Sequence, residues 1–155
     1  MATLTDSLQL DHTSARLTLQ TATIAQDSTA IRCLDWDRDR FDIEFELQNG
    51  TTYNSFLIRG DQTALVDTSH IKFESLYFDC LTGLIDPAAI DYLIVNHTEP
   101  DHSGLIRELL NRAPHITAVG AKVAIQFLEN QVHQAFKTHV VKSGDQLALG
   151  QGHQL

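Results

Sequence analysis

The fold is decided by residues 90–113, which read IDYLIVNHTEPDHSGLIRELLNRA. The first seven residues form a nearly continuous apolar run, which is typical of a strand buried inside a parallel sheet. The last eleven place Leu105, Leu109 and Leu110 on one face of a predicted helix, and Pro114 stands directly beyond its end. A buried strand that leads into an amphipathic helix indicates a layered α/β domain.

The residues on either side of this stretch continue the alternation of strands and helices. The apolar spacing predicts helices over residues 70–85 and 121–136, a buried strand over 115–120, and two short strands around Ser143–Gly144–Asp145. Asp86 is a candidate N-cap with Pro87 at the first helical position. Strand, helix, strand and helix in this order predict parallel pairing and an α/β fold class.

The first part of the chain has the shorter period of β structure. Residues 15–26 and 41–48 alternate apolar and polar side chains, and residues 51–60 form a third predicted strand. The pair Asn49–Gly50 is typical of a two-residue hairpin turn. A short buried strand ends in Asp67. We therefore expect an antiparallel meander over residues 14–67.

Composition narrows the function classes. The net charge of −9 argues against nucleic acid as a partner, because phosphate binding needs a basic surface. No apolar run reaches the ~18 residues of a membrane span, and the N-terminus does not read as a signal peptide. Cys33 and Cys80 stand in no CxxC motif, so we expect free thiols in a reducing, cytoplasmic compartment. Because the chain stops at the first residues of a predicted strand, we expect it to be the front part of a longer protein.

Four metal-ligand side chains follow the central strand within six residues: His97, Glu99, Asp101 and His102. Ligands of parallel α/β layers collect at the carboxyl ends of strands. In an extended loop, alternate side chains point the same way, so His97, Glu99 and Asp101 are expected to converge. Imidazole and carboxylate suit Zn, Fe and Mn, and the lack of cysteine favours a catalytic over a structural ion. Four ligands this close in sequence suit two ions about 3.5–4 Å apart.

Each of these residues has a simpler interpretation by itself, as a helix cap or a solvated surface group. Asp101 or Ser103 is a candidate cap for the following helix, and Gly104 permits close backbone approach. Asp67 is either a hydrogen-bond partner of a ligand or of the motif, or only a strand-end cap, and we weigh the two equally. The remaining histidines are interpreted as surface or strand-end residues: His115, His133, His139 and His153. For all four motif residues together, a metal site is favoured.

The pattern H-x-E-x-D-H after an apolar strand resembles the metallo-β-lactamase-like domain of the flavodiiron proteins, or A-type flavoproteins. Hydrolases of that superfamily usually have H-x-H-x-D-H, and here Glu99 takes the place of the second His. The added carboxylate suits an Fe(II)/Fe(III) pair better than a zinc pair. Further segments are similar in order and wording to cyanobacterial diflavin flavoproteins over roughly residues 30–155: TTYNSFLI, TALVDT, EPDHSG, HITAVGAKVAIQFLEN and GDQLALG.

This resemblance implies the N-terminal part of an αβ/βα sandwich, with residues 1–155 as a partial diiron domain. It implies that His97 and Glu99 bind one iron, and that Asp101 and His102 belong to the second. The family reduces O2 to water, or NO to N2O, with electrons from NAD(P)H that pass through FMN, often across a head-to-tail homodimer. The family's flavodoxin-like and flavin reductase domains, and its three further metal ligands, are absent from these residues, so we expect the isolated chain to be inactive.

Two other function classes stay open at this point. A zinc-dependent hydrolase of the same superfamily would share Asp101 and His102, although Glu99 argues against it. A non-catalytic remnant or interaction domain would bind no stoichiometric metal. We also expect exposed apolar surface, because the second half of such a sandwich covers one side of the sheet.

Overall fold

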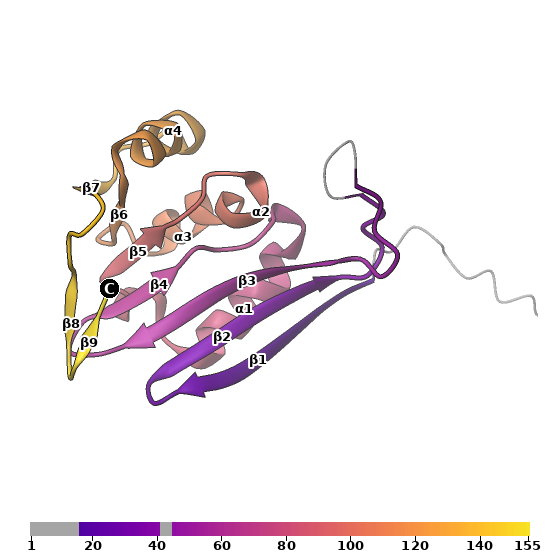
Figure 1. Ribbon diagram of the computed structural model, residues 1–155, viewed down its shortest axis with the longest axis horizontal. Coiled ribbons are helices and arrows are strands. Elements are labelled where there is room, and N and C mark those ends of the chain that lie inside the picture. The colour runs from indigo at the N-terminus through magenta and orange to yellow at the C-terminus, as the bar shows by residue number, and fades with distance from the viewer. Residues whose placement is uncertain (1–15, 41–44) are drawn as a thin grey trace, which may run out of the picture.

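The computed structural model describes residues 16–40 and 45–155. Its main feature is a seven-stranded sheet in which the strands follow their order in the chain. Strands β1 to β4 pair antiparallel and strands β4 to β7 pair parallel, so the predicted meander and the predicted parallel half meet at β4 (Figure 1). The α/β fold class is confirmed. The strands are β1 Leu17–Ala25, β2 Ser28–Asp35, β3 Thr51–Arg59, β4 Thr63–Val66, β5 Tyr92–Val95, β6 Thr117–Ala121 and β7 Lys137–Val141.

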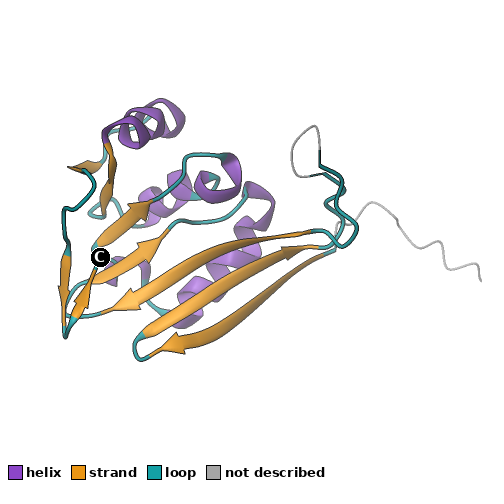
Figure 2. Ribbon diagram, in the orientation of Figure 1, coloured by secondary structure: helices purple, strands orange, loops and turns teal. Residues whose placement is uncertain are grey.

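The helices connect the strands of the second half. Figure 2 shows α1 and α3 behind the sheet, α2 at the end of β5, and a small separate hairpin of β8 and β9. In the parts of the chain that the structure describes, no helix is long and apolar enough to cross a membrane. The elements are η1 Ile71–Phe73, α1 Glu74–Leu84, η2 Pro87–Ala89, α2 Pro100–Ser103, α3 Ile106–Arg112, α4 Lys122–Val132, β8 Ala148–Gly150 and β9 His153–Gln154.

The hydrophobic core lies between the sheet and these helices. Alternate strand residues such as Leu57 and Leu93 point into it, and Tyr77 and Leu81 of α1 meet them from the helix layer. All four side chains are fully buried. At about 25 cal/mol per Å² of apolar surface removed from water, this single interface dominates the stability of the domain.

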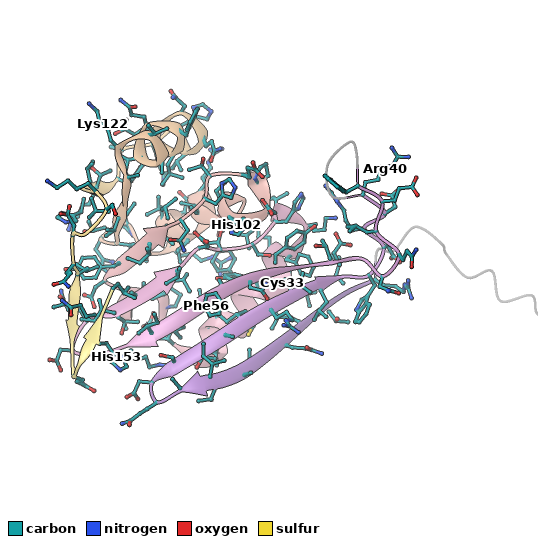
Figure 3. All side chains as sticks on the ribbon, viewed as in Figure 1. Cys33, Arg40, Phe56, His102, Lys122 and His153 are labelled. Carbon is teal, nitrogen blue, oxygen red and sulfur yellow. The ribbon has the colours of Figure 1, made fainter. Side chains whose placement is uncertain are left out.

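The opposite face of the sheet carries a second apolar row, which faces the viewer in Figure 3 around Phe56. The strand register places Ala22 beside Ala30, Ala30 beside Phe56, Phe56 beside Val66, and Val66 beside Ile94. Phe56 is 36% exposed. The expected exposed apolar surface is therefore present among the described residues.

Two predictions for the meander are wrong. The strand before β3 is β2, which the sequence reading missed, and it pairs with β3 from Asp35 beside Thr51. Of the predicted strand 41–48, residues 41–44 lie outside the described part, and the rest contributes only an isolated bridge between Arg40 and Glu46. Asn49–Gly50 is therefore no two-residue hairpin. Gly50 is still required, because its φ is +73° and a Cβ there would lie 2.1 Å from the Asp35 carbonyl oxygen.

The predicted helices are present, but their ends differ from the predicted residues. The helix predicted over 121–136 ends at Val132, because His133 adopts a left-handed conformation with φ 55°. Asp86 caps η2, as predicted, by accepting a hydrogen bond from the Ala88 N–H. The strands predicted on either side of residues 143–145 exist, but they do not pair with each other: β7 extends the main sheet and β8 pairs with β9.

Candidate metal centre

The candidate site lies at the carboxyl end of β5, where residues 96–99 form the motif loop and α2 follows (Figure 1). Glu99 is the extended N-cap of α2, and Pro100 stands at the first helical position. Asp101 and His102 therefore belong to a helical turn, and the expectation that Asp101 extends the alternation of the loop is wrong. Neither Asp101 nor Ser103 caps the helix, because α2 has no side-chain cap and Ser103 is its last residue.

The four motif side chains form two pairs. His97 Nε2 lies 3.7 Å from Glu99 Oε1, and His102 Nε2 lies 3.5 Å from Asp101 Oδ2. The rings of His97 and His102 join the pairs, with 5.3 Å between their centroids. Because 52% of His97 and 63% of Glu99 are exposed, against 17% of Asp101, the first pair faces solvent and the second is sheltered.

Asp67 connects the motif loop to α2. It follows β4 with a left-handed φ of 53°, and its Oδ1 accepts a hydrogen bond of 2.8 Å from the Asn96 N–H. Its Oδ2 lies 3.1 Å from Nδ1 of His102. A proton on Nδ1 makes this second contact a hydrogen bond and leaves the lone pair of His102 Nε2 free for a metal. Asp67 therefore contacts both the motif loop and His102, so it is more than a strand-end cap.

Two further residues hold α2 in place. Thr68, fully buried, donates from its N–H and its hydroxyl to the carbonyl oxygen of His102, at 2.8 and 2.7 Å. Gly104 approaches the backbone after Thr68 closely, as predicted, since a Cβ there would lie 2.8 Å from the Ile71 nitrogen and 2.9 Å from the Ser69 carbonyl oxygen. Sequence reasoning missed Thr68, although its place beside Asp67 was the available signal.

The chemistry of these side chains fits cations. Oδ1 of Asp101 is buried and has no hydrogen-bond partner among the described residues. A buried carboxylate oxygen without a partner costs free energy unless a cation or donor meets it. Within residues 16–40 and 45–155, however, no three His, Cys, Asp or Glu side chains gather around one point. The described residues thus supply two pairs of imidazole and carboxylate, side chains of a kind that binds iron, and no closed cage.

Comparison with known proteins shows the family of this chain. A family profile described as "ODP family beta lactamase" matches residues 51–155. This chain belongs to that family, and residues 1–155 together are called the ODP domain. The ODP domain is 72% identical over 144 residues to "Putative diflavin flavoprotein A 3" of Nostoc sp. PCC 7120, covering 93% of this chain and 25% of the relative. It is 66% identical to "Putative diflavin flavoprotein A 2" of Synechocystis sp. PCC 6803, over 100% of this chain and 27% of the relative.

A solved structure of a flavodiiron core also matches the fold of this chain. The "metal soaked Flv1 flavodiiron core" from Synechocystis sp. PCC6803 superposes with a TM-score of 0.83 at 35% identity, over 89% of the ODP domain and 35% of that chain. The resemblance to flavodiiron proteins and the metallo-β-lactamase-like fold are therefore confirmed. The chain spans about a quarter of the length of the curated relatives it matches.

Beside the site of the ODP domain lies a buried polar cluster. Asp35, 1% exposed, contacts Lys72 Nζ and accepts a hydrogen bond of 3.1 Å from the Tyr53 hydroxyl. Burial, reinforced by Asp35, raises the pKa of Tyr53 to about 12. Burial, with Lys72 and then Arg38, lowers the pKa of His70, whose ring lies 5.8 Å from that of Tyr53. Both shifts favour the neutral forms of Tyr53 and His70.

The other histidines of the ODP domain are engaged elsewhere. His115 contacts the carbonyl oxygen of Ile90 at 3.1 Å, and His153 lies 3.8 Å from Asp27. His133 ends α4, and His139 is exposed in β7. These positions agree with the strand-end and surface roles predicted for them.

Proposed function

We propose that the ODP domain is the metal-binding part of a flavodiiron oxidoreductase that reduces O2 to water, or NO to N2O. The observation that carries the proposal is the pairing of Glu99 with His97 at the end of β5, next to the pair of Asp101 and His102. A carboxylate in the second position gives the set two imidazoles and two carboxylates, which favours redox-active iron over zinc.

In this proposal His97 and Glu99 hold one iron, and Asp101 and His102 belong to the second. When bound, two irons supply Lewis acidity and electrons for the reduction of a diatomic substrate. Asp67 keeps His102 in the orientation that presents Nε2, and through the Asn96 N–H it also holds the motif loop. The exposed side chains of His97 and Glu99 leave the first pair open to a small ligand.

The rest of the reaction is assigned to segments beyond this domain. We infer that residues 1–155 are part of a metallo-β-lactamase-like domain, and that flavodoxin-like and flavin reductase domains of the whole protein carry electrons from NAD(P)H through FMN. A head-to-tail homodimer would bring the flavin of one subunit to the metal site of the other. The free thiols Cys33 and Cys80 fit a reducing, cytoplasmic location.

The isolated chain is expected to have no reductase activity, because its described residues offer two ligand pairs and no closed site. The test is a hybrid protein in which this chain replaces the matching segment of the 72% identical Nostoc relative. We expect NAD(P)H-dependent O2 or NO consumption by the hybrid at the level of the unmodified relative. Glu99→Ala should abolish the activity, while Glu129→Ala on exposed α4 should leave it unchanged.

O2 consumption by the isolated chain would contradict its expected inactivity, because it would mean that the two pairs are sufficient. An active hybrid that tolerates Glu99→Ala would overturn the proposal, because it would remove the carboxylate from the site.

A further inference from the structure

The carbonyl oxygen of Thr98 lies in the middle of the motif loop, between His97 and Glu99. It accepts a hydrogen bond of 2.8 Å from Nε2 of Gln131, and it lies 2.9 Å from the hydroxyl of Ser103. Gln131 comes from α4, thirty-three residues along the chain. The backbone between the two exposed ligands is therefore tethered to a different helix.

The position of Gln131 is itself well anchored. It stands in the last turn of α4, and its neighbours Leu128 and Val132 are buried in the core with 0% and 2% exposure. A side chain on a packed helix end is a better reference point than one on a loop, because the helix backbone is internally hydrogen-bonded. The tether thus transmits the rigidity of the core to the loop.

The orientation of the Gln131 amide follows from its two partners. Thr98 presents only an acceptor, so the NH2 group must face it, and Oε1 then lies 3.2 Å from the Ser103 hydroxyl. Ser103 has one hydroxyl proton and three acceptors in reach, the third being the carbonyl oxygen of Glu99 at 3.0 Å. The Glu99 carbonyl oxygen already accepts from the backbone N–H groups of His102 and Ser103, at 2.9 Å each. For the Thr98 carbonyl oxygen, Gln131 is the donor whose proton has no competing acceptor at this point.

We infer that Gln131 is a positioning residue for the candidate metal centre: by holding the Thr98 carbonyl, directly and together with Ser103, it fixes the backbone that carries His97 and Glu99. The inference rests on the proposed function of the motif loop as a ligand-bearing segment. His97 Nδ1 accepts a hydrogen bond of 3.1 Å from the Thr98 N–H, and His97 Nε2 lies 3.7 Å from Glu99, so the backbone at Thr98 helps to decide where these side chains stand. Gln131 acts through the loop and does not itself bind the metal.

The test measures hydrogen–deuterium exchange by mass spectrometry on the full chain at micromolar concentration. The loop and α2 contain amides protected by hydrogen bonds, including Asn96 N–H to Asp67 and His102 N–H to the Glu99 carbonyl oxygen. Gln131→Met keeps the shape of the side chain and removes the donor. Because a net hydrogen bond is modest and water can reach this exposed residue, we expect about three- to tenfold faster exchange over residues 96–103.

Three comparisons make this result specific. Asn130→Ala is the matched control, since the Asn130 amide donates only within α4, to the Gln126 carbonyl oxygen at 3.0 Å, and it should leave the loop unchanged. Gln131→Lys restores a donor and should restore the slow exchange. The peptide that covers β3 should be unaffected in all variants, which separates a loosened loop from a destabilised domain.

The metal is tested by the same exchange measurement on the hybrid with the Nostoc relative, titrated with Mn²⁺. In the hybrid that carries the wild-type segment, Mn²⁺ should slow the exchange of residues 96–103, and Gln131→Met should raise the midpoint about three- to tenfold. Unchanged loop exchange in Gln131→Met, or an unchanged Mn²⁺ midpoint beside a loosened loop, would overturn the positioning role. A loop that depends on Gln131 but never responds to Mn²⁺ would support the tether and contradict the proposed metal site.

Discussion

Asp67→Ala is the perturbation that tests the architecture of the site most broadly. Asp67 is 5% exposed and joins three elements: β4, which it ends, the motif loop through Asn96, and α2 through His102. Alanine removes both contacts at once. It also places a residue without a local hydrogen-bonding side chain at a φ of 53°, where Asp and Asn are better tolerated.

The size of the effect can be estimated from these contacts. Hydrogen bonds to charged groups contribute about 1.5–3 kcal/mol each. Because Asn96 is exposed and His102 is 34% exposed, water replaces part of both, so we take about 1 kcal/mol for each. The left-handed backbone adds about 1 kcal/mol, which gives about 3 kcal/mol in all. Asp67→Asn keeps the acceptor for the Asn96 N–H and tolerates the backbone, so it should cost only about 1 kcal/mol.

The assay is urea unfolding at pH 7, followed by far-UV circular dichroism, with the free energy of unfolding compared among the variants. Asp145→Ala is the matched control, because this exposed aspartate makes one hydrogen bond of 3.0 Å, to the Lys142 N–H in a surface turn. It should cost less than about 1 kcal/mol. An Asp67→Ala effect as small as that of the control, or equal effects of Ala and Asn at position 67, would refute the reasoning.

Three further predictions concern the core, the pH dependence and the open face of the sheet. The buried hydroxyl of Ser55 lies 2.8 Å from the Tyr77 hydroxyl, and Tyr77→Phe removes that partner. The variant should lower the free energy of unfolding in urea by about 1–3 kcal/mol. Adding Ser55→Ala to the same chain should recover part of this loss, and a larger loss would contradict the pairing. Burial and then Lys72 lower the pKa of His70, so the unfolded state binds the proton first as the pH falls. The free energy of unfolding should therefore decrease as the pH drops below about 6.5. In His70→Gln the urea midpoint should depend less on pH in this range, and an unchanged slope would refute the role of His70. Phe56→Ser should reduce concentration-dependent self-association in sedimentation velocity, whereas equal association would place the contact elsewhere.

The spacing of apolar residues along the sequence predicted those elements that bury one regular face against the rest of the domain. Strands β3, β5 and β6 and the helices α1, α3 and α4 all follow apolar spacing that one packed face explains. The failure at residues 41–48 has a different origin. Only residues 41–48 were expected to pair with β3. The pairing of β2 with β3 depends instead on the long-range register of Asp35 with Thr51, which no local period contains.

The site likewise contains residues that the sequence predicts and residues that it does not. The motif residues are recognisable because they are close together in the sequence. The helical turn that begins at Pro100 was missed, although proline is common at the first helical position. Thr68 and Gln131 were not readable, because they reach His102 and Thr98 across 34 and 33 residues. Side chains that orient a site from distant elements become visible only when the fold places them there.

The central claim is that an iron pair is bound by four side chains of the motif: His97, Glu99, Asp101 and His102. Metal content tests this claim most directly. The measurement is iron and zinc per chain, by elemental analysis after anaerobic iron reconstitution, in the hybrid with the Nostoc relative and in its Glu99→His variant. The account predicts about two irons per chain in the hybrid, with a shift from iron toward zinc in Glu99→His, which creates the hydrolase pattern. Stoichiometric zinc and little iron in the hybrid itself would contradict it, and the hydrolase interpretation would then take its place.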